Sequence, residues 1–265
     1  GYSQTGAGVA VQLADSAARH ADLLVGADGI HSGIRAQMLG PDHPRYTGNV
    51  AWRAVVPVDA LGDHVPPPTA CVWVGHRRHA VTTRVRGGAM ANFVGMIETP
   101  EPAPEGWRTT GTAADALRDF AGWDPTITAI IAQAETLNRW ALFDRAPLPR
   151  WVDGRVALLG DAAHPMMPSL AQGAVQALED AWVLAASLNT AATVEDGLVA
   201  YQERRLPRTA RVQRASAANA RLFHKASTLG RWAFYGPMAI AARVAPNLLH
   251  RRQDWVYGYD PTAAL

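Results

Sequence analysis

The sequence has few residues that could cross-link it covalently or through a metal. Cys71 is the only cysteine among 265 residues, which excludes an internal disulfide. No CxxC pair and no Cys/His spacing typical of structural zinc is present, so we predict no metal site. The formal net charge of +2, without basic clusters interleaved with aromatics, argues against nucleic acid as a partner. Such sparse cysteine fits a reducing compartment, and we expect a cytoplasmic protein.

The sequence also lacks the patterns of a leader and of a membrane span. The opening letters GYSQTGAGVAVQL have no basic region followed by an apolar run, unlike a signal peptide. The chain does not begin with methionine, and we expect it to be part of a longer protein. The apolar stretch 232–249 is a poor membrane span because Pro237, Arg243 and Pro246 interrupt it. Buried packing helices are the favoured interpretation, and a helix lying on a membrane surface is the alternative.

What the sequence does contain is an alternation of short apolar runs and helical patterns. Strands are predicted at 8–13, 21–29 and 155–160, and helices at 32–39 and 172–188. Ser32 is a suitable N-cap for the first of these helices. The run ADLLVGADG is apolar until it reaches its Gly-Ala-Asp-Gly end, which is typical of a strand buried on both faces.

The amino-acid composition changes in the middle of the chain. Residues 46–98 are rich in β-branched and aromatic side chains between turn signals, which predicts a mostly antiparallel sheet. Residues 112–135 predict two short helices with a break before Pro125. After residue 190 the pattern is helical, with an interruption at Pro207.

These patterns predict an α/β fold (α+β overall). A partial Rossmann-like domain is interrupted by a β-rich domain and is followed by C-terminal helices. The predicted domain limits are 1–45, 46–148, 149–190 and 191–265.

The stretch 155–188 carries the most chemical information. Asp161 follows a buried strand, at the end where ligands bind in open α/β sheets. A carboxylate accepts hydrogen bonds and repels phosphate, so it suits the hydroxyls of a sugar alcohol. Gln172 and Gly173 open the next helix, whose free N–H groups can receive a polarised carbonyl or a delocalised anion. A polyol chain ending in an electron-poor ring describes a flavin.

Two motifs in this sequence then resemble a known family. DLLVGADGIHSGIR and RVALLGDAAHPMMPSLAQGAVQALEDA are similar to the internal motifs of single-component FAD-dependent aromatic-ring monooxygenases. These are relatives of p-hydroxybenzoate, salicylate and 3-hydroxybenzoate hydroxylases. WRAVVP and DWVYGYD resemble the branch that contains the salicylate, 3-hydroxybenzoate and 6-hydroxynicotinate enzymes. The resemblance extends from residue 8 over nearly the whole chain.

The resemblance implies a set of cofactor-binding residues. The Asp of GDAAH contacts the ribityl chain of FAD, and the following helix N-terminus faces the flavin pyrimidine. The earlier DG motif shapes the pyrophosphate region and the route used by NAD(P)H, although an ordinary ion pair between Asp28 and Arg35 is the alternative. The residues at these positions are Asp28, Gly29, Arg35, Gly160, Asp161, Pro168, Gln172, Gly173, Ala174 and Val175.

The sequence departs from the family in its first motif, GxGxxG. In GAGVAV, Val11 stands where the third glycine belongs, and the stretch continues as a strand pattern rather than a helix. We therefore expect the chain to be the C-terminal portion of the usual protein, without the glycine loop that binds the ADP half of FAD.

His79 is the candidate catalytic base. In the related hydroxylases, a His on the substrate-domain sheet helps to deprotonate a phenol, with a Tyr four residues later. Imidazole titrates near neutrality, which suits that role. Here Thr83 replaces the Tyr, a departure that concerns the identity of the substrate rather than the type of reaction. The alternative is a solvent-exposed hairpin histidine, as we expect for His76.

Three further interpretations concern side chains outside these motifs. His164 is expected to support the GDAAHP loop, and Trp52, Trp73 and Met96 are expected in the core or pocket wall. A recurring arginine series is interpreted as a solvated helix face, with attraction of NAD(P)H or an aromatic acid as the alternative. Its members are Arg204, Arg205, Arg208, Arg211 and Arg214.

The resemblance implies a monooxygenase that uses FAD, NADH or NADPH and O₂. It would hydroxylate a small aromatic, phenolic or acidic substrate through a C4a-hydroperoxyflavin. A flavin-dependent epoxidase or reductase on the same scaffold is one alternative. A non-catalytic C-terminal fragment acting as an interaction or structural protein is the other. We expect a monomer or homodimer.

Overall fold

The computed structural model describes the chain except residues 15–16, 102–108, 225–226, 245–250, 252 and 264–265. The chain forms two compact units. Unit 1 comprises Gly1–Arg45, Asp144–Ala220 and Ile240–Leu265. Unit 2 comprises Tyr46–Phe143 and Arg221–Ala239. Each unit therefore assembles segments that are distant in the sequence.

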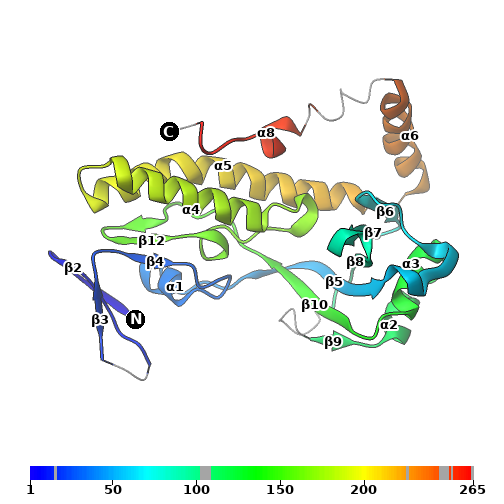
Figure 1. Cartoon of the computed structure of the whole chain (residues 1–265), viewed down its shortest axis with the longest axis horizontal. Helices are drawn as coiled ribbons and strands as arrows, with labels where there is room; N and C mark the ends of the chain where they lie inside the picture. The colour runs from blue at the N-terminus through cyan, green and yellow to red at the C-terminus, as the bar shows by residue number, and fades with distance from the viewer. Residues whose placement is uncertain (15–16, 102–108, 225–226, 245–250, 252, 264–265) are drawn as a thin grey trace. The chain divides into compact units, whose positions relative to one another are not determined.

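Unit 1 contains two three-stranded sheets and the long helices labelled α4 and α5 in Figure 1. Its strands are β1 (Tyr2–Thr5), β2 (Gly8–Val11), β3 (Arg19–Ala21), β4 (Leu24–Gly26), β11 (Val152–Asp153) and β12 (Val156–Leu158). Its helices are α1 (Gly33–Leu39), α4 (Gly173–Thr190) and α8 (Asp254–Tyr257), and α5 (Val194–Phe223) as far as Ala220. The first sheet is an antiparallel β1-β2-β3 meander. In the second, β12 pairs in parallel with β4 and antiparallel with β11.

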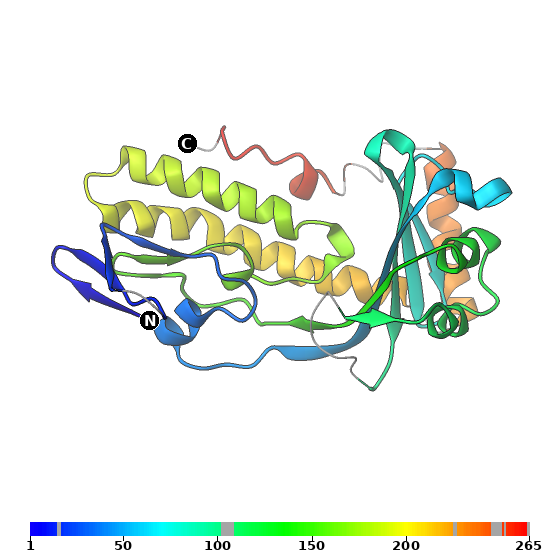
Figure 2. The same cartoon turned by 60° about the horizontal axis from the view of Figure 1, so that its bottom comes forward.

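The parallel pair confirms the Rossmann-like part of the predicted fold. Ser32 caps α1 as predicted, because its hydroxyl accepts the Arg35 N–H at 2.8 Å. Gly26 allows α1 to pack on β4, since a Cβ at this position would lie 2.8 Å from Ile34. Helices α4 and α5 run side by side (Figure 2).

The helix α5 corrects one prediction. It continues through Pro207 without interruption. Proline removes one backbone hydrogen bond and bends a helix, but packing on both sides can hold the helix together. Here Tyr201, Arg205, Thr209 and Val212 are all buried.

Unit 2 is built on a six-stranded sheet of order β6-β7-β8-β5-β10-β9. Its strands are β5 (Arg45–Pro57), β6 (Cys71–Gly75), β7 (Arg78–Val85), β8 (Met90–Glu98), β9 (Thr110–Gly111) and β10 (Leu137–Asp144). The β5–β8, β6–β7, β7–β8 and β9–β10 pairs are antiparallel, as predicted. Its helices are α2 (Ala113–Asp119), α3 (Pro125–Ala132) and most of α6 (Thr228–Val244).

Helices α2 and α3 supply the core of unit 2 together with the sheet. Trp52, Phe93, Phe120 and Ile130 are fully buried in one hydrophobic cluster. The predicted break before Pro125 is confirmed, because the Asp124 carboxylate caps α3. In the part of the chain that the structure describes, no helix is long and apolar enough to cross a membrane.

Candidate functional site

The parallel strands β4 and β12 bring the two sequence motifs to the same sheet edge. Gly26, the last residue of β4, lies opposite Leu158, the last residue of β12. The Leu159 N–H donates to the Gly26 carbonyl at 3.0 Å, so the segments that follow β4 and β12 leave the sheet side by side. Asp28 and Asp161 follow these ends within three residues. This is the edge at which open α/β sheets bind ligands.

Asp161 lies in a single 3₁₀ turn, Gly160–Ala162, directly after β12. Its side chain is exposed, and its carboxylate makes no hydrogen bond or ion pair within the described chain. Gly160 enters the turn with φ +61°, a conformation that favours glycine, and a Cβ there would lie 3.3 Å from Ala177. The local backbone therefore presents Asp161 as a free acceptor.

The N-terminus of α4 is open. Gln172 is the N-cap residue, but its side chain accepts no helix N–H, because its Oε1 instead accepts from Gln176 Nε2 at 2.9 Å. The N–H groups of Gly173, Ala174 and Val175 have no acceptor among the described residues. Ala174 and Val175 are exposed, and nothing lies within 4 Å of a Cβ built on Gly173. An 18-residue helix thus presents, at the positive end of its dipole, N–H donors that have no acceptor in the described part of the chain.

The loop before α4 is shaped by tight turns. Pro168 is exposed and begins a 3₁₀ turn over Pro168–Leu170. Ala171 follows in the left-handed region with φ +51°. The Tyr257 hydroxyl donates to the Leu170 carbonyl at 3.0 Å, so the C-terminal segment secures this loop.

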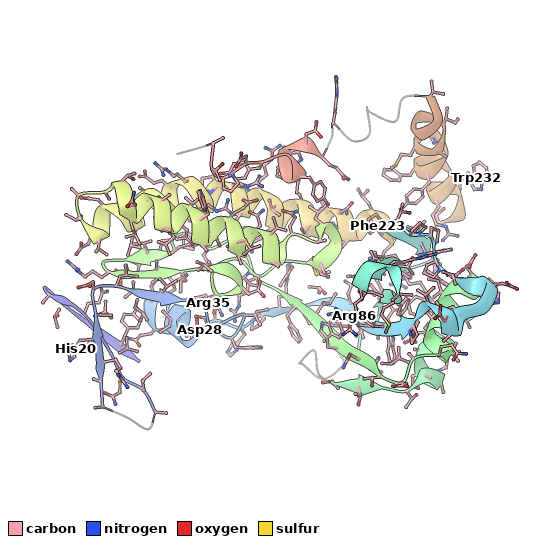
Figure 3. All side chains as sticks on the ribbon, in the orientation of Figure 1. His20, Asp28, Arg35, Arg86, Phe223 and Trp232 are labelled. Atoms are coloured by element: carbon pink, nitrogen blue, oxygen red, sulfur yellow. The ribbon has the colours of Figure 1, made fainter. Side chains whose placement is uncertain are left out.

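The DG motif is tied to its own helix. The Asp28 carboxylate accepts the Ile34 N–H at 3.2 Å. Burial would raise the pKa of Asp28, but hydrogen bonds from the Ser32 side chain and from backbone N–H groups lower it below its ordinary value. Gly29 adopts φ +82° in the turn before α1. Figure 3 labels Asp28 beside Arg35.

Arg35 is buried rather than presented to solvent. Its guanidinium donates to the carbonyls of Ile30 at 2.6 Å and Ala162 at 3.0 Å. It also lies 3.5 Å from the Asp42 carboxylate. Through Ala162, Arg35 connects α1 to the turn that holds Asp161.

A buried polar network lies behind the same turn. Asp180 is fully buried and accepts from the Gly160 N–H at 3.1 Å and from Arg205 Nε at 2.8 Å. Its carboxylate also lies 2.5 Å from His164 Nε2, so His164 supports the loop as predicted. Burial would raise the pKa of Asp180, but His164 and Arg205 together lower it.

The arginine series of α5 is not simply a solvated face. Arg205 is fully buried, and its guanidinium binds Glu179 at 2.5 Å and Gln176 Oε1 at 2.8 Å. Arg208 is largely buried and donates to Glu179 and to the Trp255 carbonyl at 2.9 Å. The prediction is wrong for these two residues because α4 places carboxylates opposite them. The signal in the sequence was the Glu-Asp pair of an otherwise apolar helix.

His79 lies on β7 in unit 2 and is buried, which excludes the exposed-hairpin alternative. Its Nδ1 is 2.6 Å from Nε2 of His224, a residue that no sequence motif indicated. Burial, and then the neighbouring His224, lower the pKa of His79 to about 3. Thr83, at the position of the family's Tyr, accepts from Asn92 Nδ2 at 3.1 Å. His76 is exposed, whereas Trp52 and Met96 are buried.

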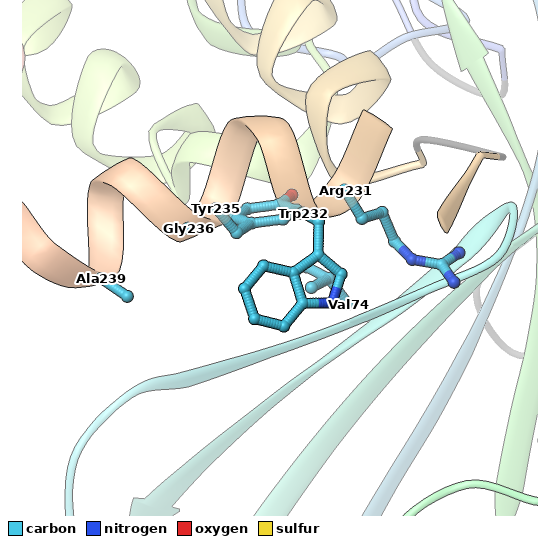
Figure 4. Close-up of a pocket in the computed structure, with 6 residues that line it drawn as sticks. All are labelled: Val74, Arg231, Trp232, Tyr235, Gly236 and Ala239. Carbon is cyan, nitrogen blue, oxygen red and sulfur yellow. The ribbon is translucent and has the colours of Figure 1, made fainter. Parts of the chain in front are cut away.

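Each unit also contains a cavity. In unit 1, a cavity of about 230 Å³ borders the loop after Asp161. It is lined by Arg45, Asp144, Arg145, Ala146, Pro147, Pro165, Met166, Met167, Gln213, Arg214 and Ala217. In unit 2, a more open and largely apolar hollow of about 440 Å³ lies between Val74 and α6 (Figure 4). Neither cavity is lined by a predicted site residue. Among the described residues, no cluster of His, Cys, Asp and Glu could hold a metal ion.

The sheet edge fits a flavin by the chemistry of its donors and acceptors. Asp161 offers an unpaired carboxylate for hydroxyl groups. The first N–H groups of α4 offer donors for a carbonyl or an anionic ring, and Gly173 leaves room for a flat group. Asp28 and Arg35 are engaged within the protein and shape the edge.

Known proteins are similar to this chain in sequence and in fold. The family model described as FAD binding domain matches residues 1–216. The 3-amino-4-hydroxybenzoate 2-monooxygenase PtmB3 of Streptomyces platensis is 37% identical over 257 residues, which cover 96% of this chain and 62% of that protein. The chain thus spans about three fifths of this curated relative.

Solved structures of related proteins have a similar fold. A salicylate hydroxylase in a substrate complex superposes with a TM-score of 0.82 at 28% identity, covering 99% of this chain and 67% of that one. Klebsiella pneumoniae HpxO, complexed with FAD and uric acid, gives a TM-score of 0.81 at 31% identity, covering 92% and 62%. With the family match extending over most of its length, the chain belongs to the FAD binding domain family, whose relatives here include FAD-dependent aromatic monooxygenases.

Proposed function

We propose that this chain binds the flavin end of FAD at the β4–β12 edge and serves the hydroxylation of a small aromatic acid or phenol. The observation that carries the proposal is the pairing of a free carboxylate, Asp161, with the unpaired N-terminal donors of α4. The names of the relatives support the class of substrate, since two of them act on a hydroxylated benzoate.

Each part of the edge has a distinct role in the proposal. Asp161 accepts hydrogen bonds from hydroxyls of the ribityl chain, and Gly160 gives it the turn it needs. The N–H groups of Gly173, Ala174 and Val175 stabilise negative charge on the pyrimidine ring. Bound FAD supplies the activation of O₂, with electrons from NADH or NADPH.

Supporting roles fall to the remaining predicted residues. Pro168 stiffens the loop before α4 and Gln172 ends it, with its side chain held by Gln176. Asp28 and Gly29 form the turn before α1. We assign Arg35 a positioning role because its guanidinium is engaged with two backbone carbonyls.

His79 is proposed as the base that accepts the proton of the substrate's ring hydroxyl. Burial, and then the neighbouring His224, keep this imidazole neutral at neutral pH, so one of its ring nitrogens can accept a hydrogen bond from that hydroxyl. Removing that proton makes the aromatic ring more nucleophilic, as oxygen transfer requires.

An FAD titration of the 265-residue chain, followed by its visible spectrum, tests the binding step. A saturable change in flavin absorbance is expected, because the chain contains both Asp161 and the N-terminus of α4 at the β4–β12 edge. NADH and NADPH oxidation should then be measured with salicylate and 3-hydroxybenzoate, with mass detection of hydroxylated product. Oxidation without hydroxylated product would favour the reductase or epoxidase alternative. Absence of flavin binding would contradict the proposal for this chain and favour the non-catalytic alternative.

A further inference from the structure

Three titratable side chains form a continuous row inside unit 2. His79 lies on β7, His224 directly follows α5, and Glu98 ends β8. His79 Nδ1 is 2.6 Å from His224 Nε2, and His224 Nδ1 is 3.0 Å from Glu98 Oε1. His79 is 1% exposed, whereas the Glu98 side chain is 30% exposed. The row therefore leads from the interior of the unit to its surface.

Both imidazoles are neutral at neutral pH. Burial, reinforced by His224, lowers the pKa of His79 to about 3. Burial also lowers the pKa of His224, although Glu98 acts in the opposite direction. A neutral imidazole has one nitrogen that donates and one that accepts, so the partner of one nitrogen decides the state of the other.

The carboxylate at the end of the row gives it a direction. An ionised Glu98 can only accept, so His224 must donate from Nδ1 and its Nε2 carries no proton. His224 Nε2 must then accept, so His79 donates from Nδ1. The Nε2 of His79 is consequently unprotonated, and it has no partner among the described residues.

We propose that Glu98, acting through His224, holds His79 in the tautomer whose Nε2 is free to accept a proton, and that this row conducts the proton towards the surface. The source of the proton, a ring hydroxyl, rests on the proposed function. When His79 Nε2 gains a proton, the Nδ1 proton of His79 moves to His224 Nε2. The Nδ1 proton of His224 moves to Glu98. Glu98, whose side chain is 30% exposed, then releases this proton to solvent, so one proton enters the row and one leaves, with no change in electrons.

Apolar side chains and one arginine are neighbours of the row. Met96 on β8 and Val74 on β6 are the residues that pair with His79 across the sheet. The centroids of the His79 and Phe223 rings are 5.0 Å apart. The Arg77 Nε donates to Glu98 Oε2 at 2.9 Å. Arg77 thereby occupies the second carboxylate oxygen and leaves Oε1 to His224.

Nitrogen NMR of the full chain with ¹⁵N-labelled histidine reads these tautomers directly. His79→Gln and His224→Gln identify the two sets of ring signals. The wild-type chain is expected to show both rings protonated at Nδ1 and unprotonated at Nε2. In Glu98→Ala, His224 loses its acceptor, and the unprotonated Nε2 signal of His79 should be lost or averaged. Glu98→Gln keeps the size of the side chain, and the same loss of preference is expected in weaker form.

Arg77→Gln is the matched control, since it removes the other partner of the same carboxylate. It should leave both tautomers unchanged. A wild-type His79 protonated at Nε2 would overturn the proposal, as would tautomers that Glu98→Ala does not alter in a folded chain. FAD binding, measured on the same samples, separates the two proposals, because the tautomers require no cofactor. Expected tautomers without FAD binding would contradict only the proposed function.

Discussion

Two aspartates of unit 1 differ in their hydrogen-bond partners, and this difference distinguishes a carboxylate available to a ligand from a structural one. Asp180 is fully buried and accepts from the Gly160 N–H, His164 and Arg205. Asp161, one residue after Gly160, is exposed and has no protein partner in the described chain. A carboxylate whose acceptor capacity is unused is available to a ligand, whereas Asp180 is committed to holding the turn.

Replacing Asp161 therefore tests the ligand site with little risk to the fold. Asp161→Ala should raise the Kd for FAD roughly tenfold to a hundredfold, because hydrogen bonds to a charged group contribute about 1.5–3 kcal/mol. Flavin titration with circular dichroism as a folding check measures both effects. Glu203→Ala removes an exposed carboxylate from α5 and serves as the control for charge. Equal Kd values for the two variants would refute the role of Asp161.

His79 makes a prediction about acid stability. Its folded-state pKa is about 3, against 6.5 for the free side chain, so below pH 6.5 the unfolded chain binds a proton that the folded chain does not. The free energy of unfolding should fall as the pH drops from about 6.5 towards 3, by about 1.4 kcal/mol per pH unit within that window. Denaturant unfolding at a series of pH values should show a shallower slope for His79→Gln. His64→Gln, which removes an exposed histidine of the same unit, should leave the slope unchanged.

At the scale of elements, the pair α4 and α5 is joined by charges as well as apolar packing. Arg205 and Arg208 of α5 bind Glu179, and Arg205 also binds Asp180. Arg211 stacks on Trp255, with 3.9 Å between the guanidinium carbon and the ring centroid. The same helix thus fixes both the support of the Asp161 turn and the C-terminal segment.

Arg205→Ala should destabilise unit 1 strongly. The change removes the arginine that binds the buried Asp180 carboxylate and one of the two arginines that bind Glu179, and breaking a buried ion pair costs about 3–5 kcal/mol. Arg214→Ala, at an exposed position of the same helix, should change stability by no more than about 0.5 kcal/mol. Thermal and denaturant unfolding of the two variants provide the measurement. Similar stabilities would show that the buried cluster contributes little to the pairing of α4 with α5.

At the scale of the whole molecule, the chain has two separate hydrophobic cores. One contains Ile130 and belongs to unit 2, and the other contains Leu158 and belongs to unit 1. Two cores built from discontinuous segments favour unfolding in more than one step.

Matched core variants can separate these steps. Ile130→Ala and Leu158→Ala each remove a fully buried side chain, at a cost of about 2–5 kcal/mol. Each is expected to lower the transition of its own unit and to leave the other in place. Calorimetry combined with near-ultraviolet circular dichroism resolves the transitions. A single transition that both variants shift equally would contradict independent cores.

Local patterns were sufficient for much of the fold. The cap at Ser32, the helix break before Pro125 and the start of α4 after Gln172 follow from interactions within a few residues, and all three are confirmed. The edge that carries Asp161 was also predictable, because a buried strand followed by Gly-Asp and a helix has few alternative geometries.

The sequence alone thus determined the strand and helix types, the resemblance to FAD-dependent monooxygenases and the motif around Asp161, since these depend on short-range spacing. Only the tertiary structure decided which charged residues are buried. Arg205 meets Asp180 across 25 positions, and His224 meets His79 across 145. Pro207 remains within α5 because flanking side chains are packed. A local pattern cannot specify such partners, because burial and pairing depend on segments that approach only when the chain has folded.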